Sequence, residues 1–332
     1  DEYKASWDLE NAPATSTAYT ALRDAGRSAS PAVSRLKGYS YLDWDGIRRQ
    51  FAITIGSRRI IVCILAGRPP AKDWDERQRG LAMAMEQSAA TTLSFSTAER
   101  DHRRGKFALK SHGISHGGGQ KSPRPLRHRP ENRQELDRLL GLPVMVQIAH
   151  FCSSVFQTWE PEVFEYYADT MAKLFKWKPA LRNYKNFAKS VFACMTMNFG
   201  PRTVTIPHRD FANLCFGFCS ITALGRFDAD HGGHLVIVPL RLVIRFPAGS
   251  SILIPSAILE HYNIPISANE HRQTVTQYTA GAIFRFVENG CQNNDVYYAS
   301  LSREGLVEAV KANRARAKEG MLRMSTLTDL RA

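Results

Sequence analysis

The chain has 332 residues and is 44% hydrophobic, which is enough to build the core of one large domain or two smaller ones and excludes a disordered chain. No apolar run approaches the roughly 18 residues of a membrane span, and we expect neither a membrane segment nor a signal peptide. The net charge is +13, from 44 Lys and Arg against 31 Asp and Glu. This excess favours a polyanion as partner, because each phosphate that a cation neutralises releases a counterion.

The positive charge is concentrated between Arg100 and Arg133, which holds ten Lys and Arg against two acids, a net of +8. Three glycines at 117–119 precede Arg124, Arg127 and Arg129. A glycine loop lets its backbone approach a ligand, and we expect the three arginines to contact a DNA backbone. The alternative is a solvated basic loop without a partner. His112 and His116 also lie here, but the glycines and prolines disfavour a helix that would hold them one turn apart on a metal.

Before residue 200 the pattern indicates scaffold. Residues 1–45 show little periodicity and are expected to form an arm that carries no chemistry. The β-branched runs at 51–55 and 60–65 predict a hairpin, and 74–88 predicts a helix. The segment 131–184 is expected to form helices that buttress a sheet. Six scattered cysteines without zinc-type pairs are expected to be free thiols in a reducing compartment.

After residue 200 the pattern becomes that of short strands separated by turns, at 214–224, 234–238, 242–246, 251–254, 273–278 and 282–287. This spacing predicts an α+β fold whose core is a two-sheet jelly roll, or double-stranded β-helix. A basic helix at 302–324 is expected to cap it. The predicted organisation is an arm at 1–45, a hairpin, basic loop and helices at 46–195, the barrel core at 196–290 and a helical cap at 291–332.

The run 203–210 alternates apolar and polar residues and ends in a His-x-Asp pair, His208 and Asp210. On an extended strand, residues two apart point to the same face, so both side chains can reach one metal ion. His261, 51 residues after Asp210, is the candidate third ligand. Two histidines and one carboxylate that leave open positions are the arrangement of the non-haem Fe(II) oxygenases.

Arg272 follows His261 by eleven residues, and Thr274 comes two later. A guanidinium presents a planar fork that matches a carboxylate, so Arg272 is the expected partner of the distal carboxylate of 2-oxoglutarate, with Thr274 on the same face of the strand. Taken singly, Arg272 could instead be a surface residue and His261 a core histidine. Their order along the chain favours a metal site.

The sequence resembles the fungal, transposon-associated branch of the TET/JBP dioxygenases. The resemblance is densest over about 195–290, and it rests on the motifs at 198–201, 207–213, 221–225, 232–235, 254–257, 261–272 and 277–281. It implies a double-stranded β-helix that binds Fe(II), 2-oxoglutarate and O₂ and oxidises methyl groups on DNA bases.

By this resemblance, His208, Asp210 and His261 are the iron ligands, and Arg272 and Thr274 contact 2-oxoglutarate. Asn213 is expected to bond the flipped base and Tyr278 to stack on it. Arg202 is predicted to assist at the co-substrate and Arg209 at the DNA backbone. The chain departs from the animal enzymes at Ala280, where they place a base-contacting His, which leaves the choice between 5-methylcytosine and N6-methyladenine open.

The sequence therefore predicts a DNA dioxygenase that acts on a methylated base in double-stranded DNA, with a nuclear location expected from that substrate. Oxidation would convert 5-methylcytosine to its 5-hydroxymethyl form and further, or demethylate N6-methyladenine. Two alternatives stay open: a catalytically idle DNA-binding module of a mobile element, and a protein or small-molecule hydroxylase on the same fold.

Overall fold

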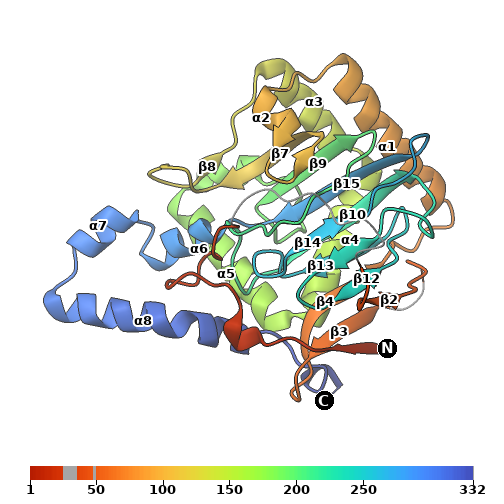
Figure 1. Cartoon of the computed structure of the whole chain (residues 1–332). Helices are drawn as coiled ribbons and strands as arrows, with labels where there is room; N and C mark the ends of the chain where they lie inside the picture. The colour runs from red at the N-terminus through yellow and green to blue at the C-terminus, as the bar shows by residue number, and fades with distance from the viewer. Residues whose placement is uncertain (25–35, 48–49, 332) are drawn as a thin grey trace.

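The computed structural model describes residues 1–24, 36–47 and 50–331, and two β-sheets form its centre (Figure 1). The larger sheet has nine strands in the order β1-β3-β4-β13-β10-β15-β9-β7-β8, and the smaller has the order β14-β11-β12-β2. The strands of the larger sheet are β1 (Glu2–Ala5), β3 (Phe51–Ile55), β4 (Ile60–Gly67), β13 (Ser251–Ile254), β10 (Cys219–Arg226), β15 (His271–Tyr278), β9 (Cys194–Gly200), β7 (Ala108–Ser115) and β8 (Arg124–Pro125). The strands of the smaller sheet are β14 (His261–Asn263), β11 (Leu235–Ile237), β12 (Leu242–Ile244) and β2 (Ser40–Leu42), and β5 (Asp101–His102) pairs with β6 (Gly105–Lys106).

The order of the central strands is that of a double-stranded β-helix. In the larger sheet β13, β10, β15 and β9 pair antiparallel, and in the smaller sheet β14, β11 and β12 do the same. From β12 to β15 successive strands alternate between the two sheets, which is the jelly-roll connection. The α+β fold with a double-stranded β-helix core that the sequence predicts is therefore confirmed.

Alternation along the strands decides what each face of the larger sheet carries. On β9, Met195, Met197 and Phe199 pack with the helices, while Thr196 and Asn198 point to the other face. On β15, Val275 joins the same helical cluster, and the threonines on either side of it line pockets. One face of the sheet is thus apolar scaffold, and the opposite face carries polar groups.

Helices cover the apolar face of this sheet (Figure 1). The covering layer is pinned at α1, where the Trp74 indole donates to the Gly249 carbonyl at 2.9 Å and Gln78 makes two bonds to the Gly225 backbone. The helices of the chain are α1 (Trp74–Thr91), α2 (Thr97–Arg100), α3 (Pro130–Leu140), α4 (Pro143–Trp159), α5 (Pro161–Trp177), α6 (Gly281–Glu288), α7 (Asn294–Ala299) and α8 (Arg303–Leu322), with 3₁₀ turns at Leu9–Asn11, Pro179–Tyr184 and Asp329–Arg331. The predicted buttressing helices and the hairpin of β3 and β4 are confirmed, and all six cysteines are free thiols.

Several predicted elements were wrong. The segment 282–287, predicted as a strand, is helix α6, whose apolar residues Ile283, Phe284, Phe286 and Val287 are all buried. A short apolar run does not reveal its period, so pattern alone could not distinguish the two structures. The basic loop was expected over 110–130, but its first six residues belong to β7, which extends to Ser115 and pairs with β9.

The two ends of the chain also differ from the prediction. The arm contributes β1, which pairs parallel with β3, and β2, which pairs parallel with β12. Most of helix α8 projects from the body instead of capping it (Figure 1), and its apolar residues Leu306, Val307 and Val310 are exposed. The second half of α8 contacts the body, where Arg316 donates to the Thr17 carbonyl at 3.1 Å and Gly320 lies against Phe216.

No single helix among the described residues is long and apolar enough to cross a membrane, although α3 and α4, bent by 68°, pass that test as a pair.

Glu160, between α4 and α5, is fully buried and fastens the C-terminal segment: its Oε2 accepts a 2.8 Å hydrogen bond from the Ser325 backbone N–H, while Oε1 has no partner. Burial raises the pKa of this carboxyl well above its usual value. When folding raises the pKa of a carboxyl group, the free energy of unfolding falls as the pH rises above the pKa of that group in the unfolded chain, which is about 4.3 for Glu. Glu160→Gln should therefore flatten this dependence, because the amide stays neutral and its oxygen can still accept the Ser325 bond.

Thermal melting between pH 5 and 8 measures this, with exposed Glu165→Gln on α5 as the matched control. The melting temperature of the wild type should fall relative to that of Glu160→Gln as the pH rises. Parallel curves for the two proteins would show that Glu160 does not titrate on unfolding in this range.

Candidate active site

The backbone brings His208 and His261 together from opposite ends of the barrel sequence. The His208 N–H donates to the His261 carbonyl at 3.1 Å, and the His261 N–H donates back at 3.0 Å. Asp210 is fixed by its N–H, which donates to the Ser256 carbonyl at 2.8 Å. The prediction of a regular strand at 203–210 was wrong: this segment has no strand of its own and joins the edge of the smaller sheet through one isolated bridge, between His208 and His261.

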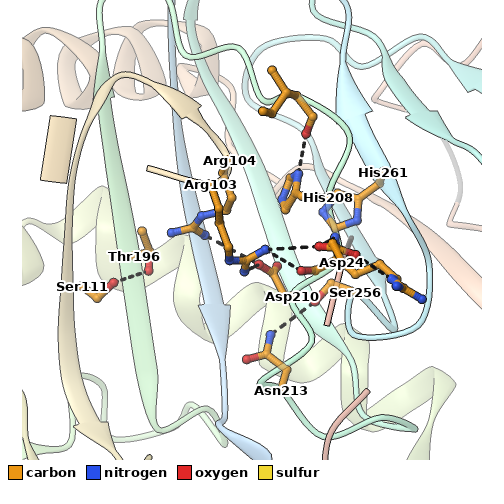
Figure 2. Close-up of polar contacts among 12 residues, drawn as sticks. Asp24, Arg103, Arg104, Ser111, Thr196, His208, Asp210, Asn213, Ser256 and His261 are labelled. Atoms are coloured by element: carbon orange, nitrogen blue, oxygen red, sulfur yellow. Dashed lines mark hydrogen bonds and ion pairs between the residues drawn. The ribbon is translucent and has the colours of Figure 1, made fainter. Parts of the chain in front are cut away.

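His208, Asp210 and His261 form a buried cluster whose ligand atoms all lie within 4.8 Å of one another. Figure 2 shows the two imidazoles side by side next to the Asp210 carboxylate. His208 Nδ1 lies 2.7 Å from the Ile206 carbonyl, and His261 Nδ1 lies 2.8 Å from the Leu259 carbonyl. Each Nδ1 thus donates to a carbonyl and leaves Nε2 as the lone-pair donor, which is how metal-binding histidines are oriented.

The charge state of the cluster also suits a metal. Burial, reinforced by the neighbouring His261, lowers the pKa of His208 well below its usual value, and burial lowers the pKa of His261. For Asp210, burial would raise the pKa, but the charges of Arg104 and Arg103 outweigh it and hold the pKa low. At neutral pH the site presents two neutral imidazoles and one carboxylate, the protonation state that metal binding requires.

Arg272 lies fully buried on β15 and has an incomplete set of partners. Its Nη1 donates to the Thr203 carbonyl at 2.9 Å, while Nε and Nη2 have no partner. Among the residues that the structure describes, no acid forms an ion pair with it; it packs near the rings of Phe227 and Phe246, and burial lowers its pKa to about 9. Buried charges in proteins are normally paired, so this guanidinium is prepared for an anion.

A pocket lies at the metal ligands and reaches β15 at Thr274, two residues from Arg272, which does not itself line the pocket. The polar residues that line it are all three ligands with Arg104, Asn198, Thr205, Asn263, Thr274 and Thr276. Thr274 accepts a 2.7 Å hydrogen bond from Asn198, whose own Oδ1 has no partner. The pocket is small, lies between the two sheets, and has apolar walls at Phe107, Ile221 and Leu235. The two imidazoles and the carboxylate beside it are a donor set that fits Fe(II).

A second pocket lies on the other side of Asp210. It is lined by Arg103, Arg104, Ser115, His116, Thr196, Asp210, Ala212, Asn213, Thr276, Tyr278 and Ala280. Both predicted base contacts, Asn213 and Tyr278, therefore lie next to a metal ligand. The Asn213 amide donates to the Ser256 hydroxyl at 3.3 Å (Figure 2). The Tyr278 hydroxyl is hydrogen-bonded to the side chains of Ser111 and Thr196.

Sequence reasoning missed the residues that complete the site from elsewhere in the chain. Arg103 reaches Asp210 at 3.1 Å and Asp24 at 3.7 Å, so it links the arm, which was expected to carry no chemistry, to a metal ligand (Figure 2). Arg104 lies 3.8 Å from the same carboxylate. Only the charge of the segment 100–133 signalled these arginines, and nothing in the sequence signalled Asp24.

Other predicted contacts lie outside these pockets. Arg202 is exposed and its backbone pairs with that of Arg272 in an isolated bridge, and its predicted contact with the co-substrate stays a prediction. Arg209 is held by Asp24 at 2.7 Å, which makes it a bridge to the arm. The three remaining predicted DNA contacts, Arg124, Arg127 and Arg129, are exposed on and after β8, where they are free to meet a phosphate.

No protein-family model and no curated protein matches the chain. Among similar solved structures is NgTET1 in complex with 5mC DNA, 14% identical, with a TM-score of 0.46 over 73% of this chain and 83% of that one. Another is an oxidoreductase of the 2OG-Fe(II) oxygenase family from Burkholderia pseudomallei, 16% identical, with a TM-score of 0.36 over 73% and 96%. The TET/JBP resemblance agrees with the first name, and its fungal branch stays a prediction. Both likenesses are distant, so we infer the function from the side chains of the site.

Divalent metal should stabilise the protein through His208, Asp210 and His261. An ion present at about 100 times its dissociation constant adds roughly 2.7 kcal/mol to the free energy of unfolding. Thermal melting with and without Mn²⁺ measures this, and a chelator should reverse it. Asp210→Ala and His261→Ala should abolish the gain, and Asp228→Ala, which removes an exposed carboxylate outside the cluster, should keep it. An equal gain in all four proteins would place the ion elsewhere.

Proposed function

We propose that the protein is an Fe(II)/2-oxoglutarate-dependent dioxygenase that oxidises the methyl group of a methylated base flipped out of DNA. The observation that carries this proposal is Arg272, fully buried in the barrel that holds the metal ligands, with two guanidinium nitrogens unpartnered. Each unpaired buried donor costs about 1–3 kcal/mol. An idle DNA-binding module has no use for such a group, since it only destabilises the folded chain, whereas an enzyme that binds a dicarboxylate needs it.

Different side chains of the site would hold the metal and the co-substrate. His208, Asp210 and His261 would hold the iron, and Arg272 with Thr274 would hold the distal carboxylate of 2-oxoglutarate. When bound, iron, 2-oxoglutarate and O₂ supply the oxidising power that hydroxylates a C–H bond. The protein keeps both imidazoles neutral, keeps Asp210 ionised, and surrounds the pocket with β-sheet that limits access of water.

The second pocket supports a nucleotide base as the substrate. A methyl group inside a duplex cannot reach a buried site, so the nucleotide has to be extruded and held by stacking and by its polar edge. Tyr278 offers a ring and Asn213 an amide, and both lie beside Asp210. The net charge of +13 and exposed Arg124, Arg127 and Arg129 supply attraction to phosphates. The same charge disfavours a protein or small-molecule hydroxylase, and a DNA substrate implies a nuclear location.

Either methylated base is compatible with this pocket, because its wall at Ala280 is small and apolar. Oxidation of 5-methylcytosine would give 5-hydroxymethylcytosine and higher states. Oxidation of N6-methyladenine would give an unstable hydroxymethylamine that releases formaldehyde, a net demethylation.

Mass spectrometry of nucleosides tests the proposal. The protein is incubated with Fe(II), 2-oxoglutarate and duplexes that carry either methylated base, and succinate is measured in parallel. The wild type should oxidise at least one base with matching succinate, and His208→Ala should lose this activity while it still binds DNA. A wild type that takes up no iron would favour the idle module, and turnover on a peptide but on neither duplex would favour the hydroxylase.

Arg272→Met should separate binding of the co-substrate from folding. Replacing an unpaired buried charge with an apolar chain of similar length is neutral or stabilising, so the melting temperature without ligand should not fall. The apparent KM for 2-oxoglutarate should rise more than tenfold, because a charge-assisted pair is worth about 1.5–3 kcal/mol. Arg79→Met, which changes an exposed arginine of α1 that lines neither pocket, is the matched control and should leave the KM unchanged. An unchanged KM in Arg272→Met would refute the role of Arg272.

Asn213→Ala should weaken use of methylated DNA without weakening use of 2-oxoglutarate, because Asn213 lines the second pocket and not the first. We expect kcat/KM for DNA to fall about 5- to 100-fold, from the loss of one or two hydrogen bonds to the base. Steady-state kinetics with each substrate varied in turn measures this. Equal losses for both substrates would show that Asn213 supports the metal site and does not read the base.

A further inference from the structure

His116, the residue after β7, is a wall of the second pocket that the proposed function leaves without a role. It lines this pocket together with Asn213, Tyr278 and Ala280, and only 8% of its surface is exposed. Its imidazole packs edge-on against the Phe286 ring of α6, with centroids 5.4 Å apart. The ring is therefore held in place from the side of α6.

The two ring nitrogens of His116 differ in their partners. The ring makes a hydrogen bond to the Ser122 backbone, and Nδ1 is buried without a partner. Burial, with the nearby charge of Arg285, lowers the pKa of His116 to about 4, so the ring is neutral at physiological pH. In a neutral imidazole whose other nitrogen donates to a carbonyl, Nδ1 is a lone-pair acceptor. An unsatisfied buried acceptor of this kind calls for a donor from a ligand.

Ala280 cannot supply such an acceptor, because it carries only a methyl group. Arg103 and Arg104 bring only donors to the pocket. Asn213, which is bridged to Ala280 through the backbone, has one acceptor in its amide oxygen. His116 adds a second neutral acceptor, at the end of β7.

We propose that His116 selects the base by accepting a hydrogen bond from its exocyclic amino group. This inference rests on the proposed function. Cytosine and adenine present an N–H donor at N4 or N6, whereas thymine presents a carbonyl oxygen at the corresponding position. An acceptor facing an acceptor leaves both groups unpaired, so His116 favours methylated bases that keep an exocyclic N–H over thymine, which carries the same C5 methyl group as 5-methylcytosine.

The test compares 5-methylcytosine with thymine in binding and in turnover. Each base is placed opposite an abasic position in an otherwise identical duplex, so that extrusion from the helix costs a similar amount. Binding is measured by fluorescence anisotropy with Mn²⁺ in place of iron and without O₂, which does not depend on catalysis. Turnover is measured by mass spectrometry of the hydroxymethyl products, with succinate as the measure of co-substrate use.

The wild type should prefer 5-methylcytosine about 5- to 100-fold in both measurements. His116→Ala and His116→Phe should lose this preference, and His116→Gln, whose amide oxygen is an acceptor, should restore part of it. His150→Ala removes a histidine that lines neither pocket and should behave as the wild type.

Three results would overturn the assignment of His116. The wild type could bind both bases equally, His116→Phe could keep the full preference while it folds, or all His116 variants could lose affinity for both bases by the same factor. The proposed function fails separately, when the wild type binds with a preference but oxidises no base.

Discussion

The backbone pairing of His208 with His261 is the contact on which the site depends. Two backbone hydrogen bonds, at 3.1 and 3.0 Å, join the segment between β9 and β10 to strand β14. Because the pairing is antiparallel, it fixes both imidazoles at one level of the sheet, and the carbonyls of Ile206 and Leu259 then orient the rings through Nδ1. The metal cluster follows from backbone geometry first and from side-chain chemistry second.

The larger sheet positions the rest by simple alternation. Every second residue of β9 and β15 joins the helical layer, and the residues between them line the pockets. Arg272 lowers the stability of the folded chain, because its charge is buried beside aromatic rings and makes one hydrogen bond, to the Thr203 carbonyl. Stability alone does not account for such a residue, and an anionic ligand does.

The sequence predicted the barrel and the clustering of His208, Asp210 and His261, because strand spacing, the His-x-Asp pair and the later His261 follow one order along the chain. It could not predict α6, since a six-residue apolar run fits a strand and a helix equally. It also could not place Arg103, Asp24 or His116, because their roles come from long-range contacts between the arm, β7 and the barrel. Nor could it predict the partners of Arg202 and Arg209, because the backbone bridge of Arg202 to Arg272 and the ion pair of Arg209 with Asp24 are also long-range contacts.

The central claim is that one barrel site holds iron and 2-oxoglutarate together, and an anaerobic titration tests it most directly. Fe(II)-loaded protein is titrated with 2-oxoglutarate while the visible absorption of an Fe(II) chelate of a 2-oxo acid is recorded. The account predicts a band that saturates at about one 2-oxoglutarate per chain and is absent in His261→Ala. A wild type that binds Fe(II) but develops no band, or a His261→Ala variant with the same band, would contradict it.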